Sequence, residues 1–150
     1  FCRSCYAKYS TRTITVNIKN CQSFTIVDEY GNKKYRTQNG VYVRSQQEMI
    51  IYDAIYNKRI RIEYEKKVPY IDDNGEQKEL KPDFYLPDYN LYIEHWGYEA
   101  KSDPEYKKSK EYKMKVYEKR GLKVASTYNE DIDDIQAALE KIFLKFNINV

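Results

Sequence analysis

Long apolar runs are absent from this chain of 150 residues. No stretch approaches the roughly 20 consecutive apolar residues that a helix needs to span a bilayer, so we expect no membrane association. No basic segment followed by an apolar core marks a secretory signal, and we therefore expect a cytoplasmic protein. The chain begins at Phe1 rather than Met, so we expect it to be a piece of a longer protein.

Cysteine and histidine are scarce, which restricts both disulfides and metal sites. Three cysteines cannot all pair within one chain, and the spacing of Cys2, Cys5 and Cys21 suggests a zinc ribbon in a cytosolic setting. A tetrahedral site needs four ligands, and the only histidine, His95, lies in a strand to which we assign other chemistry. Two interpretations stay open: a Zn²⁺ site completed by a ligand upstream of Phe1, or three ordinary thiols.

A strong excess of one charge is also lacking. The net charge of +3 permits nucleic-acid binding without indicating it. Basic residues do gather in one predicted helical segment, 101–123. The seventeen tyrosines could stack on bases, but a tyrosine-rich core is the better account of them.

Residues 1–44 have the alternation and turn signals of a small β-rich region. The pattern predicts strands at 11–19, 23–28 and 41–43 and near Tyr35, with turns at 30–32 and 39–40.

At Ser45 the apolar period changes, and residues 45–150 are predicted to form a separate domain. The predicted elements are a helix at 45–57, strands at 59–68, 80–86 and 91–96 with a turn at 72–75, a strand at 122–126 and a last helix capped by Asn129. Another helix is predicted to begin at Pro104, with Asp103 or Ser102 as its cap, and to end just before Gly121. This order predicts an α/β fold with a mixed sheet and helices on both of its faces.

The most informative stretch of the chain is 81–97. It places Asp83 directly after Pro82 on one short strand and Glu94 on the next strand. Two carboxylates on neighbouring strands can bind Mg²⁺ or Mn²⁺, because hard cations take a few carboxylate oxygens and keep several waters. Glu94 also stands on an otherwise apolar or aromatic strand, where a carboxylate is costly unless it is paired or bound to a cation.

The element order and the residues at 81–97 resemble the PD-(D/E)XK nuclease superfamily, whose restriction-endonuclease-like core is a helix, a three-stranded meander, a helix and a strand. The resemblance is closest to the nuclease-like domain attached to helicase IV-type superfamily 1 helicases. Those domains show a similar Arg/Lys-Pro-Asp-Phe-Tyr-Leu-Pro run and a similar Tyr-Ile-Glu-His-aromatic-Gly run. The resemblance covers residues 45 to about 128 and leaves 1–44 unexplained.

The resemblance implies that Asp83 and Glu94 bind the metal and that Glu48 on the first helix completes the acidic cluster. Each residue also has a structural interpretation. Asp83 could be a strand-start residue after Pro82. Ser45-x-x-Glu48 is a capping box, in which the glutamate bonds back to the start of its own helix.

The lysine of the family pattern is displaced in this chain, because Trp96 stands where the simplest pattern has lysine. The preferred replacement is Lys113 on the following helix, and the alternative is Lys101 in an E-x-K sequence. Alternation along the strand places Trp96 on the same face as Glu94 and His95 on the other. A solvated lysine on a lysine-rich helix is the structural interpretation of Lys113.

The resemblance implies a Mg²⁺- or Mn²⁺-dependent endonuclease-type phosphodiesterase that acts on DNA in preference to RNA. It also implies a larger nucleic-acid-processing protein with a helicase or another attached domain. Two alternatives stay open. One is a catalytically inactive nuclease-fold module that binds nucleic acid, which the replacement by Trp96 favours. The other is a zinc-ribbon interaction module built on the three cysteines.

Overall fold

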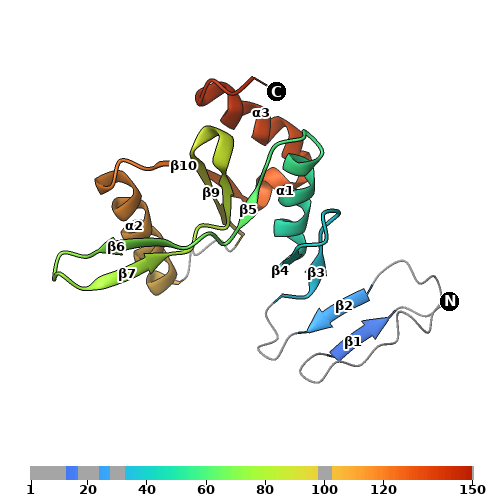
Figure 1. The fold of residues 1–150 in the computed structure, drawn as a ribbon, viewed down its shortest axis with the longest axis horizontal. Coiled ribbons are helices and arrows are strands. Elements are labelled where there is room, and N and C mark those ends of the chain that lie inside the picture. The colour runs from blue at the N-terminus through green and yellow to red at the C-terminus, as the bar shows by residue number, and fades with distance from the viewer. Residues whose placement is uncertain (1–12, 17–23, 28–32, 98–102, 150) are drawn as a thin grey trace. The chain divides into compact units, whose positions relative to one another are not determined.

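The computed structural model describes residues 13–16, 24–27, 33–97 and 103–149 of the chain (Figure 1). The chain forms two compact units, 1–53 and 54–150, so the division falls within helix α1 (Gln46–Tyr56). The predicted domain boundary at 44/45 lies just before this helix and stays a prediction.

The first unit contains two antiparallel strand pairs, as the alternation in residues 1–44 predicts. The bounds are β1 (Thr13–Val16) paired with β2 (Phe24–Val27), and β3 (Tyr35–Arg36) paired with β4 (Tyr42–Val43). The predicted turn at 39–40 is confirmed: Gly40 has φ +79° and donates its N–H to the carbonyl of Thr37 at 3.0 Å. A positive φ of this kind costs glycine little, because it has no Cβ.

The second unit is built on a four-stranded mixed sheet, which confirms the predicted mixed α/β class. Its strand order is β10-β9-β8-β5. The strands are β5 (Glu63–Tyr64), β8 (Phe84–Leu86), β9 (Leu91–Trp96) and β10 (Lys123–Tyr128). β10 runs parallel to β9, whereas β8 is antiparallel to both β9 and β5. β9 is therefore an inner strand with a partner on each side.

The prediction of one strand over 59–68 is wrong, because the chain leaves the extended conformation twice in that range. Arg59 has φ +60° and Glu65 has φ +52°, both in the left-handed region, and only β5 forms between them. The chain then makes a separate antiparallel hairpin of β6 (Val68–Ile71) and β7 (Gln77–Leu80). The predicted turn at 72–75 joins these two strands.

The predicted strand 80–86 is also interrupted. β7 ends at Leu80, and β8 begins at Phe84. Pro82 lies in the gap and has no N–H to donate to a strand ladder, which accounts for the break. The interruption makes Asp83 the residue that immediately precedes β8.

The predicted helix after residue 103 is confirmed as α2 (Pro104–Lys119). The side chain of Asp103 accepts hydrogen bonds from the backbone N–H groups of Glu105 and Tyr106, so it caps the helix. Gly121 follows the helix with φ +65°.

The predicted cap of the last helix at Asn129 is wrong. Residues Asn129–Asp134 form a 3₁₀ helix, η3, and α3 spans Ile135–Lys145. Asp131 accepts the backbone N–H of Tyr128 at 2.7 Å, and Asp134 accepts that of Ala137 at 3.1 Å. Two successive aspartate caps therefore divide the segment into a tight turn and a helix.

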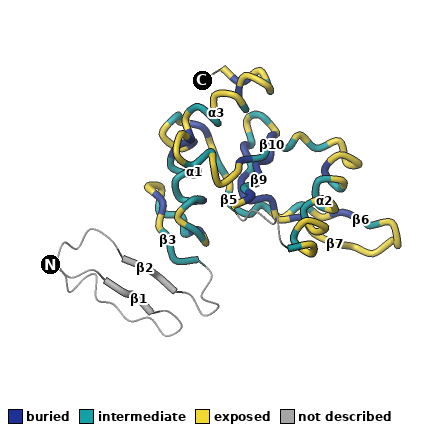
Figure 2. Tube along the Cα trace, turned by 180° about the vertical axis from the view of Figure 1, so that it is seen from behind, coloured by how far each residue is buried: buried dark blue, intermediate teal, exposed yellow. Residues whose placement is uncertain are grey.

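α2 covers one face of the sheet, with η3 and α3 on the opposite side (Figure 1). On the α2 side, a buried cluster joins the β6–β7 hairpin, β9 and α2, and its members are Tyr70, Leu80, Tyr92 and Tyr117. Buried residues are concentrated along β9, where every residue except His95 is buried (Figure 2). In the described part of the chain, no helix is both long and apolar enough to cross a membrane.

We expect Gly121→Ala to lower the free energy of unfolding by about 1 kcal/mol, because a left-handed backbone brings a Cβ close to the carbonyl oxygen. A Cβ at this position meets no other atom within 4 Å, so the cost is that of the backbone alone. Gly121→Asn is the matched control and should cost less, since asparagine tolerates the conformation better. Urea denaturation measures both, and equal losses in the two variants would contradict the explanation.

Candidate metal and phosphodiester site

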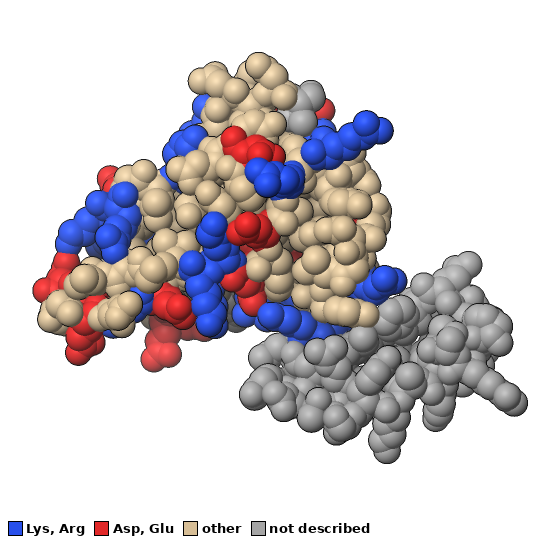
Figure 3. All heavy atoms as spheres, viewed as in Figure 1, with Lys and Arg blue, Asp and Glu red and all other residues tan. Residues whose placement is uncertain are grey.

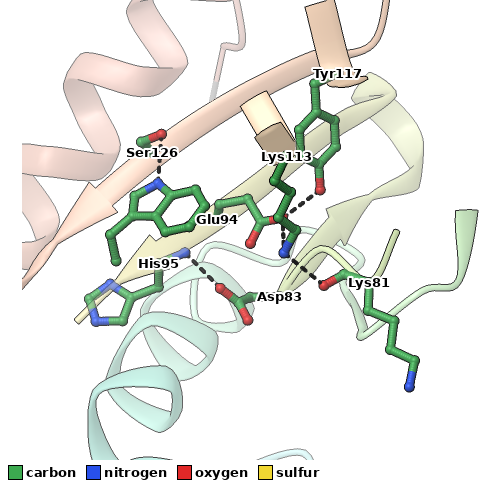
Figure 4. Close-up of polar contacts among 8 residues, drawn as sticks. Lys81, Asp83, Glu94, His95, Lys113, Tyr117 and Ser126 are labelled. Atoms are coloured by element: carbon green, nitrogen blue, oxygen red, sulfur yellow. Dashed lines mark hydrogen bonds and ion pairs between the residues drawn. The ribbon is translucent and has the colours of Figure 1, made fainter. Parts of the chain in front are cut away.

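Asp83 and Glu94 are brought together by the pairing of β8 with β9. The antiparallel register places Phe84 opposite Ile93. Asp83 and Glu94 each lie one position beyond that pair, so they are opposite one another with side chains on the same face. The backbone N–H of His95 donates to Oδ2 of Asp83 at 2.7 Å, which fixes that carboxylate (Figure 4).

Glu94 is a buried carboxylate with two strong donors on one oxygen. Its exposed fraction is 2%. Oε1 accepts the hydroxyl of Tyr117 at 2.5 Å and lies 2.6 Å from Nζ of Lys113. Both donors come from α2, one helical turn apart, so they lie on the same helix face. A buried carboxylate needs such compensation, because removing it from water costs several kcal/mol.

Lys113 is held beside the carboxylates by further contacts. Nζ also donates to the backbone carbonyl of Lys81 at 3.3 Å, and it lies 5.8 Å from the ring centroid of Trp96. A quarter of its side chain is exposed, so the ammonium stands at the edge of the site and not in bulk water. The structure thus brings Lys113 to Glu94, whereas the alternative, Lys101, lies outside the described residues.

Tyr117 is the site residue to which the sequence analysis gives no role. Its side chain is fully buried, and burial together with the neighbouring carboxylate of Glu94 raises the pKa of its hydroxyl. It therefore stays protonated and acts as a hydrogen-bond donor. The only sequence signal is its position four residues after Lys113 on a helix, which predicts a shared face but no role.

Glu48 belongs to the first unit, where it contributes to the start of α1. The hydroxyl of Ser45 accepts the backbone N–H of Glu48 at 3.1 Å, and Oε2 of Glu48 accepts the backbone N–H of Arg44 at 3.0 Å. These are the reciprocal bonds of a capping box, except that Glu48 accepts the N–H of Arg44, one residue before the usual donor Ser45. The structural interpretation of Glu48 is thus supported, and its membership of the acidic cluster stays a prediction.

His95 and Trp96 point to opposite faces of β9, as alternation predicts. The indole N–H of Trp96 donates to the hydroxyl of Ser126 at 3.1 Å, on the face that carries Glu94 (Figure 4). Nδ1 of His95 lies 2.9 Å from the hydroxyl of Thr127. Burial lowers the pKa of His95, and the negative charge of Asp131 only partly offsets this effect.

The donor atoms at Asp83 and Glu94 fit a hard divalent cation. Both side-chain contacts of Glu94 fall on Oε1, so Oε2 is the oxygen that it can offer to a metal. Within the described ranges, no three or more His, Cys, Asp or Glu side chains converge. Mg²⁺ can be bound by one or two carboxylates together with waters and substrate phosphates, so a pair suffices for it. The predicted zinc ligands Cys2, Cys5 and Cys21 lie outside the described residues.

Comparison of the chain with protein-family models, curated proteins and solved structures finds no match in any of the three.

We expect Lys113→Met to lower the free energy of unfolding by about 2 kcal/mol. Removing one partner of a fully buried pair typically costs 3–5 kcal/mol, and the partial exposure of Lys113 reduces that figure. Adding Glu94→Gln should recover part of the loss, because a neutral amide needs no cation. Urea denaturation of the single and double variants measures the coupling between Lys113 and Glu94. The control is Lys108→Met, an exposed change on the same helix, which should lower the free energy of unfolding by less than about 0.5 kcal/mol. Equal stability of the single and double variants would show that the ion pair does not matter.

The lowered pKa of His95 makes stability depend on pH. Its ordinary value is 6.5, so below that pH the unfolded chain binds a proton more readily than the folded one does. The free energy of unfolding should therefore fall as the pH decreases through 6.5 toward the folded-state pKa. His95→Asn keeps a polar atom facing Thr127 but cannot titrate. Its loss of stability between about pH 7.5 and pH 5.5 should be smaller than that of wild type; an equal loss would contradict the assignment.

Proposed function

We propose that Asp83, Glu94 and Lys113 form the active site of a metal-dependent nuclease of the endonuclease type, on a restriction-endonuclease-like core. The observation that carries the proposal is the 2.6 Å contact between Nζ of Lys113 and Oε1 of Glu94. It supplies, from α2, the lysine that Trp96 displaces from the strand. With Asp83 opposite Glu94, the site then has two carboxylates and one ammonium group on a single face.

Each side chain has a definable task in phosphodiester hydrolysis. A Mg²⁺ or Mn²⁺ ion at the carboxylates would supply Lewis-acid stabilisation of the charge that grows on the phosphate. Asp83 and Glu94 would hold that cation, and the N–H of His95 and the hydroxyl of Tyr117 fix the two carboxylate groups. The ammonium of Lys113 can orient an attacking water and stabilise the developing oxyanion.

The exposed cations of the α2 segment and the family resemblance both support a nucleic acid as the substrate. α2 and its C-cap residue carry exposed cations that suit phosphate contacts independent of sequence, namely Lys115 and Arg120. Acidic side chains lie among the basic ones on the face in Figure 3, so the attraction is local to particular elements. DNA as the preferred substrate, attachment to a helicase or another domain, and a cytoplasmic location rest on the sequence alone.

A second candidate is an inactive nuclease-fold module that binds nucleic acid without cutting it. The observation that favours it is the compensation of Glu94, whose buried charge is already balanced by Lys113 and Tyr117. A site with that balance can be stable without a cation. The zinc-ribbon alternative concerns cysteines outside the described residues.

We expect metal-dependent cleavage of single- or double-stranded DNA, lost on chelation. Asp83→Asn, Glu94→Gln and Lys113→Met should each reduce the rate by about a hundredfold or more, the typical effect of removing one electrostatic contributor. Lys108→Met should retain activity, because Lys108 is exposed and lies on another helix face. Gel assays with Mg²⁺ or Mn²⁺ measure the rates. A folded wild type that cuts neither DNA nor RNA would support the inactive module instead.

A further inference from the structure

A concave site lies on the flank of α2 that packs against the β6–β7 hairpin. It is a pocket of about 300 Å³, lined among others by Tyr70, Tyr112, Lys115 and Arg120. This volume is at the lower end of the range of small-ligand sites. None of the proposed catalytic residues lines it.

The charge of this pocket is positive once its ion pairs are taken into account. Two aspartates line it, but Asp72 pairs with Lys78 at 2.8 Å, and Asp73 pairs with Lys119. Among the described residues, no carboxylate pairs with Lys115 or Arg120. Two uncompensated cations therefore remain at the pocket, which makes it suited to an anion.

The pocket also presents an aromatic ring that is held in place yet exposed. The hydroxyls of Tyr70 and Tyr112 lie 3.0 Å apart, and the guanidinium of Arg120 lies 5.8 Å from the ring centroid of Tyr70. Tyr112 nevertheless keeps 47% of its surface exposed. An exposed ring beside two cations is an arrangement with which proteins bind single strands, stacking a base and contacting the phosphate.

We propose that this pocket binds one nucleotide of a single-stranded nucleic acid, with the phosphate at Lys115 and Arg120 and the base on Tyr112. This is a binding site separate from the proposed catalytic centre and does not depend on cleavage. α2 presents Lys113 and Tyr117 to β9, whereas it presents Tyr112 and Lys115 to the hairpin. An acidic peptide would use the cations but not the ring.

The test measures binding without divalent metal, so that cutting plays no part. Fluorescein-labelled oligothymidylate and oligouridylate of about ten nucleotides, within the site size of single-strand binders, are titrated with the whole chain in EDTA, and anisotropy gives the Kd. We expect Lys115→Gln/Arg120→Gln to weaken binding about tenfold. The slope of log K against log salt should fall by about 0.7 in magnitude, since one neutralised single-strand phosphate contributes about 0.7.

Lys107→Gln/Lys108→Gln is the matched control, because it removes the same charge from exposed positions outside the pocket. Tyr112→Ala should weaken binding about fivefold or more, whereas Tyr112→Phe, which keeps the ring, should bind nearly as wild type does. Equal losses in the two double variants, or no effect of Tyr112→Ala, would overturn the proposal. Competition by polyglutamate as strong as that by unlabelled oligonucleotide would also overturn it, in favour of an acidic protein segment.

Asp83→Asn separates this proposal from the nuclease. It should bind oligonucleotide normally even where it abolishes cutting. Pocket-dependent binding by a chain that never cuts would leave the pocket assignment intact and remove the nuclease. If Lys115→Gln/Arg120→Gln changed neither cutting nor binding, the nuclease would stand and the pocket assignment would be wrong. Greater affinity for oligothymidylate than for oligouridylate would assign the pocket to DNA, and the opposite order to RNA.

Discussion

The burial of Glu94 is the constraint on which the rest of the site depends. A carboxylate with 2% exposure on an inner strand is stable only if donors reach it. α2 meets that requirement by placing Lys113 and Tyr117 one turn apart over the same oxygen. The rotation of the helix on the sheet is thereby fixed, and the other carboxylate oxygen of Glu94 is left for a cation. The contacts that stabilise buried Glu94 therefore also determine which of its oxygens is available for the proposed cation.

We propose a different site on each flank of α2. The flank toward β9 carries the compensated carboxylate, and the flank toward the β6–β7 hairpin carries the pocket with its two uncompensated cations. The hairpin is essential to the second arrangement, because its aspartates neutralise Lys78 and Lys119 and leave Lys115 and Arg120 available. Under the two proposals, one helix would hold a nucleic-acid strand at one flank and present catalytic groups at the other, and the two sites share no residue.

Much of the fold could be predicted from short-range signals. The Asp103 cap, the left-handed Gly121 and the alternation in 91–96 each depend on neighbours within a few residues, and all three appear as expected. The predictions failed where a local pattern was overridden. Left-handed residues at Arg59 and Glu65 shorten a strand that alternation alone would continue. Successive aspartate caps likewise replace the single cap expected at Asn129.

Local sequence patterns specify the strand that carries Glu94, the aspartate that precedes the neighbouring strand, and the helix that follows. They leave the lysine open between Lys113 and Lys101, give Tyr117 no role and give no sign of the pocket. Only the tertiary structure brought Lys113 to Glu94, because that contact joins residues on different elements. The bond from Tyr117 to Glu94 spans 23 positions, and that from Lys113 to Lys81 spans 32. Contacts over such separations depend on sheet register and helix rotation, which local patterns do not specify.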